Sequence, residues 1–263
     1  MRPERIGIVG GRGRMGRWFA NLFKRAGYQV EISDLGTPLS NQDLARQCPV
    51  VFLAVPMERF EEVVIQVGPL MPPEAGLIDL CSLKARQVAV MLRETTCQVV
   101  GAHPLFGPGE NSIVGQRVAL CPARGNGWFN WFKDFLDTQG AETVVISPEE
   151  HDQLMAVIQV LNHFILLALG EVINRQGLDP QRLVNLATPS FIRQLNILSR
   201  LADQDPHLYA AIQFDNPAGD QIREAFARAV SKLKEIAQER REEEFVQLFT
   251  EVQTLGQKIR KAK

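Results

Sequence analysis

The sequence lacks the features that mark several classes of protein. Its 263 residues carry a formal net charge of −1, so no excess of one sign favours nucleic acid or an anionic membrane as a partner. The four cysteines include no C-x-x-C pair, and no cluster with metal-ligand spacing is seen. The N-terminal "MRPERIGIVGG" has no long apolar stretch of the kind that a signal peptide needs. We therefore expect a reduced, cytoplasmic protein without a metal.

One long apolar run is present, "VIQVLNHFILLALGEVI" at residues 157–173. It is too short for a typical membrane span and contains Asn162, His163 and Glu171, so a buried helix explains it better. A helix that is apolar around most of its circumference must be covered on all sides. The sequence therefore predicts a homodimer built through the C-terminal half, in which the second subunit supplies part of this cover.

Up to about residue 147, short β-rich runs alternate with helical patterns. The expected strands are residues 5–10, 28–33, 49–55, 76–80, 98–102, 117–122 and 142–147, with helices between many of them, for example at 15–26, 57–67 and 128–139. Apolar strands separated by helices predict a mostly parallel sheet that is covered on both faces.

After Ser147 the pattern becomes helical. The segment "SPEE" begins the first helix with an N-cap serine, a proline at the first helical position and a glutamate three residues on. Breaks between the later helices are expected near residues 177–180, Pro189, Pro206 and Pro217. The sequence therefore predicts an α/β domain over residues 1–147 and an all-α domain over residues 148–263.

A glycine-rich segment, "GIVGGRGRMGRWFANLF", contains the end of the first strand and opens a helix. Gly11, Gly13 and Gly16 have G-x-G-x-x-G spacing, in which glycines permit a tight turn and let backbone amides approach a pyrophosphate at the helix N-terminus. This predicts that the α/β domain is a Rossmann-type dinucleotide-binding domain. The expected cofactor contacts are the loop and the end of the third strand: Gly10, Gly11, Arg12, Gly13, Arg14, Met15, Gly16, Val55 and Pro56.

Asp34 follows the second strand, where a carboxylate can accept hydrogen bonds from the adenosine ribose hydroxyls. The same carboxylate would repel a 2′-phosphate, so NAD is favoured over NADP. Arg12 and Arg14 point the other way, because either could offer its charge to a phosphate.

Two further loops fall at the carboxyl ends of the strands, where an open α/β sheet binds its ligands. "DLCSLK" follows the fourth strand and "GAHPLFGP" follows the fifth, which places Ser82 and His103 beside one crevice. A neutral His103 could accept a proton from a substrate hydroxyl while Ser82 orients the imidazole. Serine hydrolysis is disfavoured because the sequence has no nucleophile elbow.

The segments "VGGRGRMG", "DLCSLK", "GAHPLFGP", "EEHDQLMAVIQVLNHF" and "SRLADQDPHLYAAI", in this order, resemble the prephenate dehydrogenase family of tyrosine biosynthesis. The resemblance is strongest to the dehydrogenase half of the chorismate mutase–prephenate dehydrogenase fusions. It implies a Rossmann domain joined to a helical dimerisation domain, and oxidative decarboxylation of prephenate to 4-hydroxyphenylpyruvate with NAD. Since the sequence starts at the glycine-loop strand, we expect neither a mutase nor a regulatory domain, which leaves feedback inhibition by tyrosine open.

The resemblance also implies roles for single residues. His103 becomes the histidine that takes the proton of the substrate 4-hydroxyl, with Ser82 as its neighbour, and Arg200 becomes the arginine that holds a substrate carboxylate. His163 falls on a second histidine of the pocket, and Gln159 lies one turn earlier on the same helix, although these two could instead satisfy each other in a core. His151, beside Asp152, is interpreted as a structural partner.

Three other functions stay open. The first is an arogenate dehydrogenase. Arogenate carries an amino group where prephenate carries the side-chain keto group, and no residue decides between the two substrates. A β-hydroxyacid or imine reductase would also join a Rossmann domain to a helical one, but those families place a lysine where this helix offers Gln159 and His163. A catalytically silent NAD-binding sensor is disfavoured by the presence of His103, Ser82 and Arg200 together.

Overall fold

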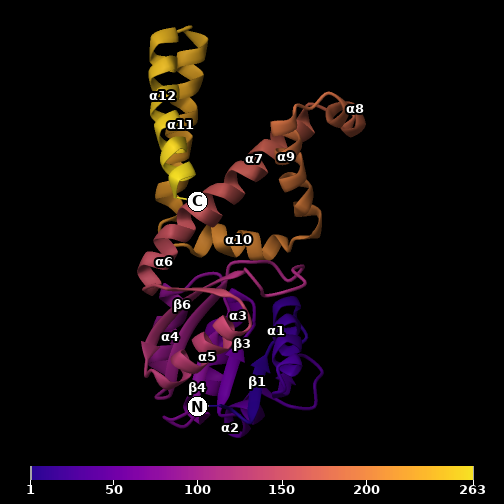
Figure 1. Ribbon diagram of the computed structural model, residues 1–263, viewed down its shortest axis with the longest axis vertical. Coiled ribbons are helices and arrows are strands. Elements are labelled where there is room, and N and C mark those ends of the chain that lie inside the picture. The colour runs from indigo at the N-terminus through magenta and orange to yellow at the C-terminus, as the bar shows by residue number, and fades with distance from the viewer. Residues whose placement is uncertain (1, 263) are drawn as a thin grey trace.

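The computed structural model of the protein describes residues 2–262 and has an N-terminal half built on a sheet and a helical C-terminal half (Figure 1). The seven strands follow the spatial order β2-β1-β3-β4-β5-β6-β7. They are β1 (Arg5–Val9), β2 (Gln29–Ser33), β3 (Val50–Leu53), β4 (Gly76–Asp79), β5 (Gln98–Pro104), β6 (Arg117–Arg124) and β7 (Glu142–Val145). All neighbours pair in parallel except β5 and β6, which are antiparallel. The predicted Rossmann-type fold is confirmed.

Five helices cover this sheet: α1 (Arg14–Arg25), α2 (Asn41–Gln47), α3 (Met57–Val67), α4 (Ala85–Glu94) and α5 (Gly127–Thr138). Apolar residues of α2, α3 and α4 form one buried cluster with one face of the strands. The aromatic side chains of α1 and α5, such as Phe23 and Phe132, form the other cluster. Strands β3 and β4 are buried along their whole length because both faces are covered, which is why their sequences are apolar without alternation.

The helical half begins with α6 (Pro148–Met155), whose N-cap Ser147 accepts a hydrogen bond from the Glu150 amide as predicted. A π-helical turn (Ala156–Leu161) leads into α7 (Asn162–Arg175). The rest comprises α8 (Pro180–Asn185), α9 (Pro189–Ser199), a 3₁₀ turn (Arg200–Asp203), α10 (Pro206–Asp215), α11 (Gly219–Gln238) and α12 (Glu242–Lys261). Prolines open α8, α9 and α10 at the predicted breaks. The reversal between α11 and α12 was not predicted; Arg240 has a positive φ of 54° there.

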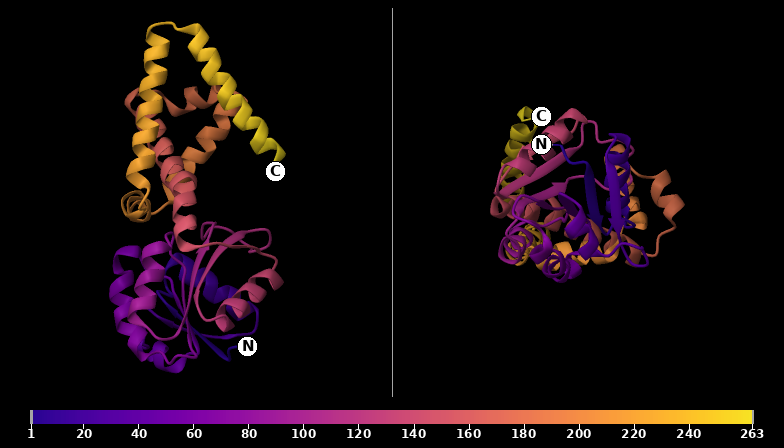
Figure 2. Two further views of the ribbon diagram at one scale, coloured as in Figure 1. Left: turned by 90° about the vertical axis from the view of Figure 1, so that its left-hand side faces the viewer. Right: turned by 90° about the horizontal axis from the view of Figure 1, so that it is seen from below.

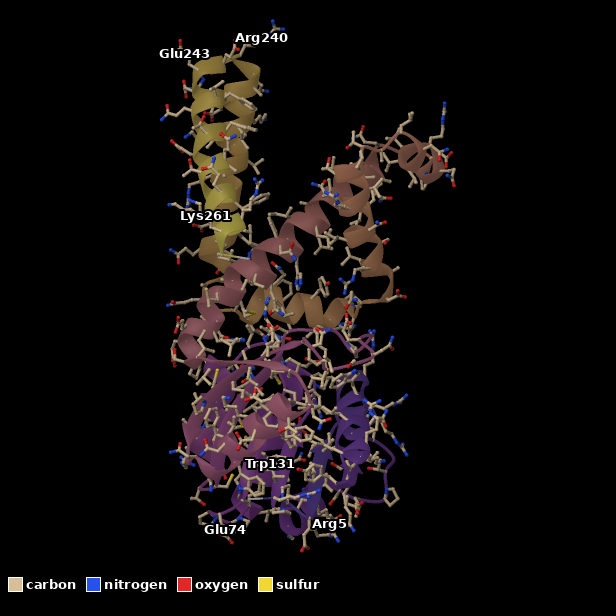
Figure 3. All side chains as sticks on the ribbon, viewed as in Figure 1. Arg5, Glu74, Trp131, Arg240, Glu243 and Lys261 are labelled. Carbon is tan, nitrogen blue, oxygen red and sulfur yellow. The ribbon has the colours of Figure 1, made fainter. Side chains whose placement is uncertain are left out.

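The helical half leaves much of its apolar surface uncovered within one chain. The segment Pro148–Arg175 is long and apolar enough to cross a membrane. Its most apolar 18-residue window has a mean hydropathy of 1.9, yet only 17% of this window is buried. Helix α12 also presents apolar side chains to solvent, among them Phe245, Phe249 and Ile259. Figures 2 and 3 show α11 and α12 projecting away from the α/β domain, with Arg240 and Glu243 at the tip. The cover predicted for the long helix is therefore not supplied by the chain itself.

We expect the protein to be a homodimer in which a second copy covers these apolar faces, because exposed stripes of this length are unfavourable in water. Light scattering coupled to size exclusion should give about twice the chain mass of 29.4 kDa at micromolar concentration. Phe249→Glu on α12 should shift the mass towards the monomer, whereas Gln247→Glu on the same helix should leave it unchanged. A monomeric mass for the unmodified protein would contradict this assembly.

Candidate active site

The glycine loop occupies the point where the order of the parallel strands reverses. Strand β1 lies between β2 and β3, so the segments that follow β1 and β3 flank the crevice in which open α/β sheets bind ligands. Gly10 has a φ of +78°, and a side chain on it would meet the carbonyl of Ala54 beyond β3. A side chain on Gly16 would meet the carbonyl of Gly10, so the loop can close onto α1 only with glycine at these positions.

The N-terminus of α1 suits a pyrophosphate. Its N-cap is Gly13, which supplies no side-chain cap, and its first turn contains no acidic residue. The backbone N–H groups there are left for a ligand, and the helix dipole favours a negative charge at this end. Of the other expected contacts, Met15 and Val55 are half-buried against the two core clusters, and Pro56 is the exposed N-cap of α3.

Asp34 lies at the end of β2 and is tied to the glycine loop. Its carboxylate accepts hydrogen bonds from the amide of Arg12 at 2.8 Å and from the amide of Leu35 at 2.7 Å. The Arg12 guanidinium donates to the Leu35 carbonyl at 3.1 Å and thus stays at the adenosine end of the crevice. Arg14 instead donates to the carbonyl of Asp203 in the helical half, at 2.8 Å. The two arginines of the loop therefore have different surroundings.

A buried ion pair lies beneath the crevice. The Lys84 ammonium contacts the Asp79 carboxylate and donates to the Ala102 carbonyl at 2.7 Å, and the side chains of both charged residues are fully buried. The same Asp79 oxygen accepts the amide of Cys81 at 2.9 Å. Burial raises the pKa of Asp79, and the charge of Lys84 opposes that rise.

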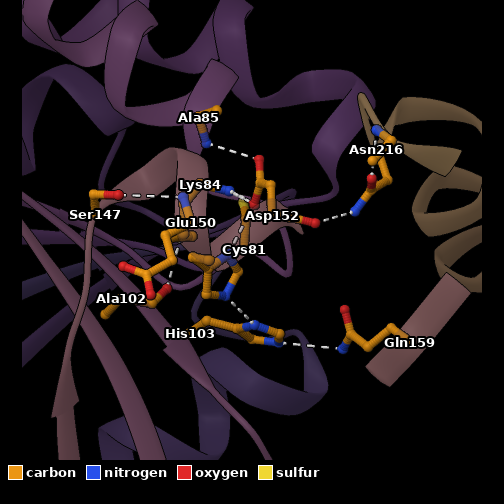
Figure 4. Close-up of polar contacts among 12 residues, drawn as sticks. Cys81, Lys84, Ala85, Ala102, His103, Ser147, Glu150, Asp152, Gln159 and Asn216 are labelled. Atoms are coloured by element: carbon orange, nitrogen blue, oxygen red, sulfur yellow. Dashed lines mark hydrogen bonds and ion pairs between the residues drawn. The ribbon is translucent and has the colours of Figure 1, made fainter. Parts of the chain in front are cut away.

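Asp152 connects the helical half to the sheet. Its two carboxylate oxygens accept the amides of Lys84 at 2.8 Å and of Ala85 at 2.9 Å, so it caps the N-terminus of α4 from a different part of the chain. Its own carbonyl accepts from the Asn216 side chain at 2.9 Å, just before α11. Figure 4 shows these contacts converging beside His103. The contacts of Asp152 with Lys84, Ala85 and Asn216 were not predicted, because these residues lie more than 60 positions away along the chain.

His103 is buried and lies inside β5, which runs two residues further than predicted. The expected loop is a strand here because β6 pairs with it, and His103 lies opposite Ala119. The Nδ1 atom of His103 is 2.9 Å from Nε2 of His151, whose Nδ1 is 2.8 Å from the Asp152 carboxylate. Burial, followed by the charges of His151 and Lys84, holds the pKa of His103 well below its usual value. His151, interpreted from the sequence as a structural partner, thus contacts the predicted catalytic histidine.

The other nitrogen of His103 faces the helical half, where Gln159 Nε2 lies 3.4 Å away. Gln159 belongs to the π-helical turn, and the Val160 carbonyl in this turn accepts a hydrogen bond from buried Gln213 at 2.8 Å. Single π-helical turns within α-helices are frequent at functional sites. The turn therefore places Gln159 over the imidazole.

The remaining predicted substrate residues lie on the helical half. His163 stacks on Tyr209 with 4.1 Å between the ring centroids, and burial lowers the pKa of His163. Burial raises the pKa of Tyr209, and the charge of Arg200 opposes that rise. Arg200 itself begins the 3₁₀ turn and is exposed. Within residues 2–262, buried Nδ1 of His163 and Oε1 of Gln159 have no hydrogen-bond partner, an arrangement that suits a polar ligand.

Ser82 lies between β4 and α4 and is half-buried. The pairing of Asp79 with Gly101 brings the ends of β4 and β5 together, so Ser82 and His103 lie at the same edge of the sheet. Among the hydrogen bonds of the described residues, none joins Ser82 to His103. No group of three or more possible metal ligands occurs in residues 2–262 either.

Comparison with known proteins identifies the two domains of one family in this chain. Residues 23–145 match "Prephenate dehydrogenase, nucleotide-binding domain" and residues 147–251 match "Prephenate dehydrogenase, dimerization domain". The "Probable arogenate/prephenate dehydrogenase" of Methanocaldococcus jannaschii is 31% identical over 94% of this chain and 59% of its own length. The "4-amino-4-deoxyprephenate dehydrogenase" of Streptomyces pristinaespiralis is 30% identical over 93% of this chain and 88% of its own length.

The first curated relatives are longer proteins, and this chain spans 56–59% of their length. Two fungal relatives, 22–23% identical, carry NADP(+) in their names. Among solved structures, the prephenate dehydrogenase of A. aeolicus in complex with hydroxyphenyl propionate and NAD+ has a TM-score of 0.76 and 23% identity, and the match covers 98% of this chain and 99% of that one. This likeness supports the fold of both halves.

The buried ion pair leads to a prediction about stability. Lys84→Met should lower the free energy of unfolding by about 3–5 kcal/mol, because it leaves the Asp79 carboxylate buried without its partner. Lys133→Met is the matched control, since it removes the partly exposed pair with Asp137 and should cost less than about 1 kcal/mol. Urea unfolding at a fixed protein concentration measures both. Equal losses in the two variants would contradict the importance of the buried pair.

Proposed function

Because this chain belongs to the prephenate dehydrogenase family, we propose that it converts prephenate to 4-hydroxyphenylpyruvate by oxidative decarboxylation, with NAD as the cofactor. Residues 1–147 hold the cofactor, and residues 148–263 complete the substrate site and form the dimer. The observation that carries the proposal is the position of His103, which is buried beside the cofactor crevice with one ring nitrogen directed at Gln159 of the helical half.

His103 is proposed as the general base. Prephenate carries a hydroxyl group on the ring carbon that is oxidised, and the C–O bond can become a carbonyl only if the hydroxyl proton leaves. The Nε2 atom of His103 takes this proton. The nicotinamide supplies the chemistry of hydride acceptance from the same carbon. Carbon dioxide then leaves, the ring becomes aromatic, and the bonding electrons move to the ring oxygen, which takes a proton back.

The low pKa of His103 keeps this base neutral around pH 7. Its causes are burial first, and then the electrostatic effects of His151 and Lys84. A neutral imidazole at the start of the reaction can accept a proton, whereas an imidazolium cannot. Ser82, at the same edge of the sheet, is proposed to orient the substrate hydroxyl or the imidazole.

The helical half is proposed to hold the charged groups of the substrate. Arg200 would pair with a carboxylate, since a guanidinium recognises carboxylates through two parallel hydrogen bonds. His163 and Gln159 supply the buried polar atoms that lack partners within the described residues. The Arg14 contact with Asp203 ties the turn that begins at Arg200 to the glycine loop. This contact holds the proposed cofactor loop close to the turn that carries Arg200.

NAD is proposed over NADP because the Asp34 carboxylate stands at the adenosine end of the crevice. Its two bonds to backbone amides leave lone pairs for the ribose hydroxyls. Arg12, which lies beside it, is the residue placed to receive a 2′-phosphate if the preference were reversed. The NAD complex of the A. aeolicus protein supports this assignment, and the names of the fungal relatives oppose it.

A crossed assay tests the substrate and the cofactor together. Prephenate and arogenate are each offered with NAD and with NADP, and kcat/KM should be highest for prephenate with NAD. Asp34→Ser should narrow the preference for NAD, because it removes the negative charge that repels the 2′-phosphate. A preference of the unmodified protein for NADP would refute the role of Asp34. Turnover of arogenate alone would make this protein an arogenate dehydrogenase.

Two variants separate the base from the substrate-binding residue. His103→Asn should lower kcat by roughly 10²–10⁴-fold, because the amide cannot accept the proton, while the affinity for NAD stays nearly unchanged. Arg200→Gln should mainly raise KM, because its carboxylate contact exists before the transition state as well. Near-normal turnover of His103→Asn would refute the mechanism. A loss of NAD binding in both variants would indicate a folding defect instead.

A further inference from the structure

We propose that His151 and Asp152 form a proton relay with His103, so that the proton taken from the substrate comes to rest on His151. This inference rests on the proposed function, in which His103 is the general base. The three side chains lie in series, with 2.9 Å between His103 Nδ1 and His151 Nε2, and 2.8 Å between His151 Nδ1 and the Asp152 carboxylate. All three are buried.

The hydrogen-bond donors around Asp152 fix the direction of the series. Its carboxylate accepts the amides of Lys84 and Ala85, so it acts as an acceptor at the N-terminus of α4. His151 must then carry its proton on Nδ1 and present a lone pair on Nε2. That lone pair accepts the Nδ1 proton of His103, which leaves Nε2 of His103 unprotonated on the side of Gln159. The arrangement selects the tautomer that a general base needs.

The relay moves protons without consuming any. As the substrate O–H bond breaks, an N–H bond forms at His103 Nε2. The N–H bond at His103 Nδ1 then breaks, and a new one forms at His151 Nε2, so that the imidazolium is His151 beside the Asp152 carboxylate. When the ring oxygen of the aromatic product takes its proton, the same bonds change in reverse. The net reaction therefore releases no proton at the histidines.

The surrounding charges favour His151 as the resting place. The side chains that contact His103 are His151, which is followed by Asp152 on α6, and the neutral Gln159. The pair of Lys84 and Asp79 lies next to them, because Lys84 binds the carbonyl of Ala102, the residue before His103. The charge of Lys84 disfavours a proton on His103 although Lys84 pairs with Asp79, whereas the carboxylate of Asp152 lies directly against His151 and has only neutral donors besides it. Burial keeps the pKa of His103 low, which makes His103 a weak base unless it can pass its proton on.

His151→Gln tests the relay, because the glutamine oxygen can still accept from His103 Nδ1 but cannot take a proton. We expect kcat to fall roughly 10- to 100-fold, with KM for prephenate and for NAD nearly unchanged. The acid limb of kcat/KM should also move, because in the unmodified protein it belongs to the coupled pair of histidines and in the variant to His103 alone. His207→Gln, the same change at an exposed histidine of α10, should leave kcat and the acid limb unchanged.

Normal kcat and an unmoved acid limb in His151→Gln would overturn the relay and leave His151 with a structural role. The proposed function fails separately, if His103→Asn keeps its turnover. Nitrogen-15 NMR of histidine side chains in the unmodified protein gives an independent measurement that does not depend on how the variant folds. The relay requires the Nδ1–H tautomer at both His103 and His151, and an Nε2–H tautomer at His103 would overturn it.

Discussion

The carboxylate of Asp152 is the contact on which the geometry of the site depends. It binds the first amides of α4, so the segment after β4 cannot shift relative to α6 without breaking these bonds. The neighbouring residue His151 contacts His103 near the end of β5. The backbone carbonyl of Asp152 accepts a hydrogen bond from the side chain of Asn216, just before α11. Parts of the chain that are distant in sequence meet at one residue. The helical half is therefore positioned by hydrogen bonds at the place where the chemistry is proposed, in addition to apolar packing.

The ion pair of Lys84 and Asp79 supports the same place from below. A buried ion pair is weak evidence for stability, because removing two charges from water costs about as much as their attraction returns. Its position is more informative than its energy. The Lys84 ammonium also binds the carbonyl of Ala102, the residue before His103, and thereby fixes the end of the strand that carries the imidazole. Charge is used here to hold a backbone in place at the edge of the sheet.

Local signals in the sequence predicted most of the fold. Strands such as β3 and β4 are apolar throughout because both of their faces are covered, and prolines mark the starts of α8, α9 and α10. The reversal at Arg240 was missed because it contains neither glycine nor proline, the residues that usually mark a turn. His103 was expected in a loop, since the pairing with β6 that extends the strand depends on residues later in the chain.

The candidate site was predicted less completely for the same reason. Glycine spacing predicted the cofactor loop, and strand order predicted that His103 lies beside the crevice. The resemblance to a known family pointed to His163 and Arg200 as well. A histidine next to an aspartate at the start of a helix is an ordinary arrangement, so nothing local distinguished His151. Its contact with His103 spans 48 residues and exists only once α6 has docked on the sheet.

The π-helical turn at Ala156–Leu161 also separates the position of Gln159 from the phase of the long helix. Each residue of an α-helix advances the side chains by about 100°, and a π-helical turn accommodates one extra residue without unwinding the helix. Deleting a single residue between Ala156 and Leu161 would therefore turn this segment into regular α-helix and leave α7 in nearly its present phase, so that His163 would still face Tyr209. The same deletion in a regular α-helical turn would rotate every later side chain by about 100°. The change at the π-helical turn would instead be local, at Gln159 beside His103, and the surface that α7 offers to a second subunit would be kept.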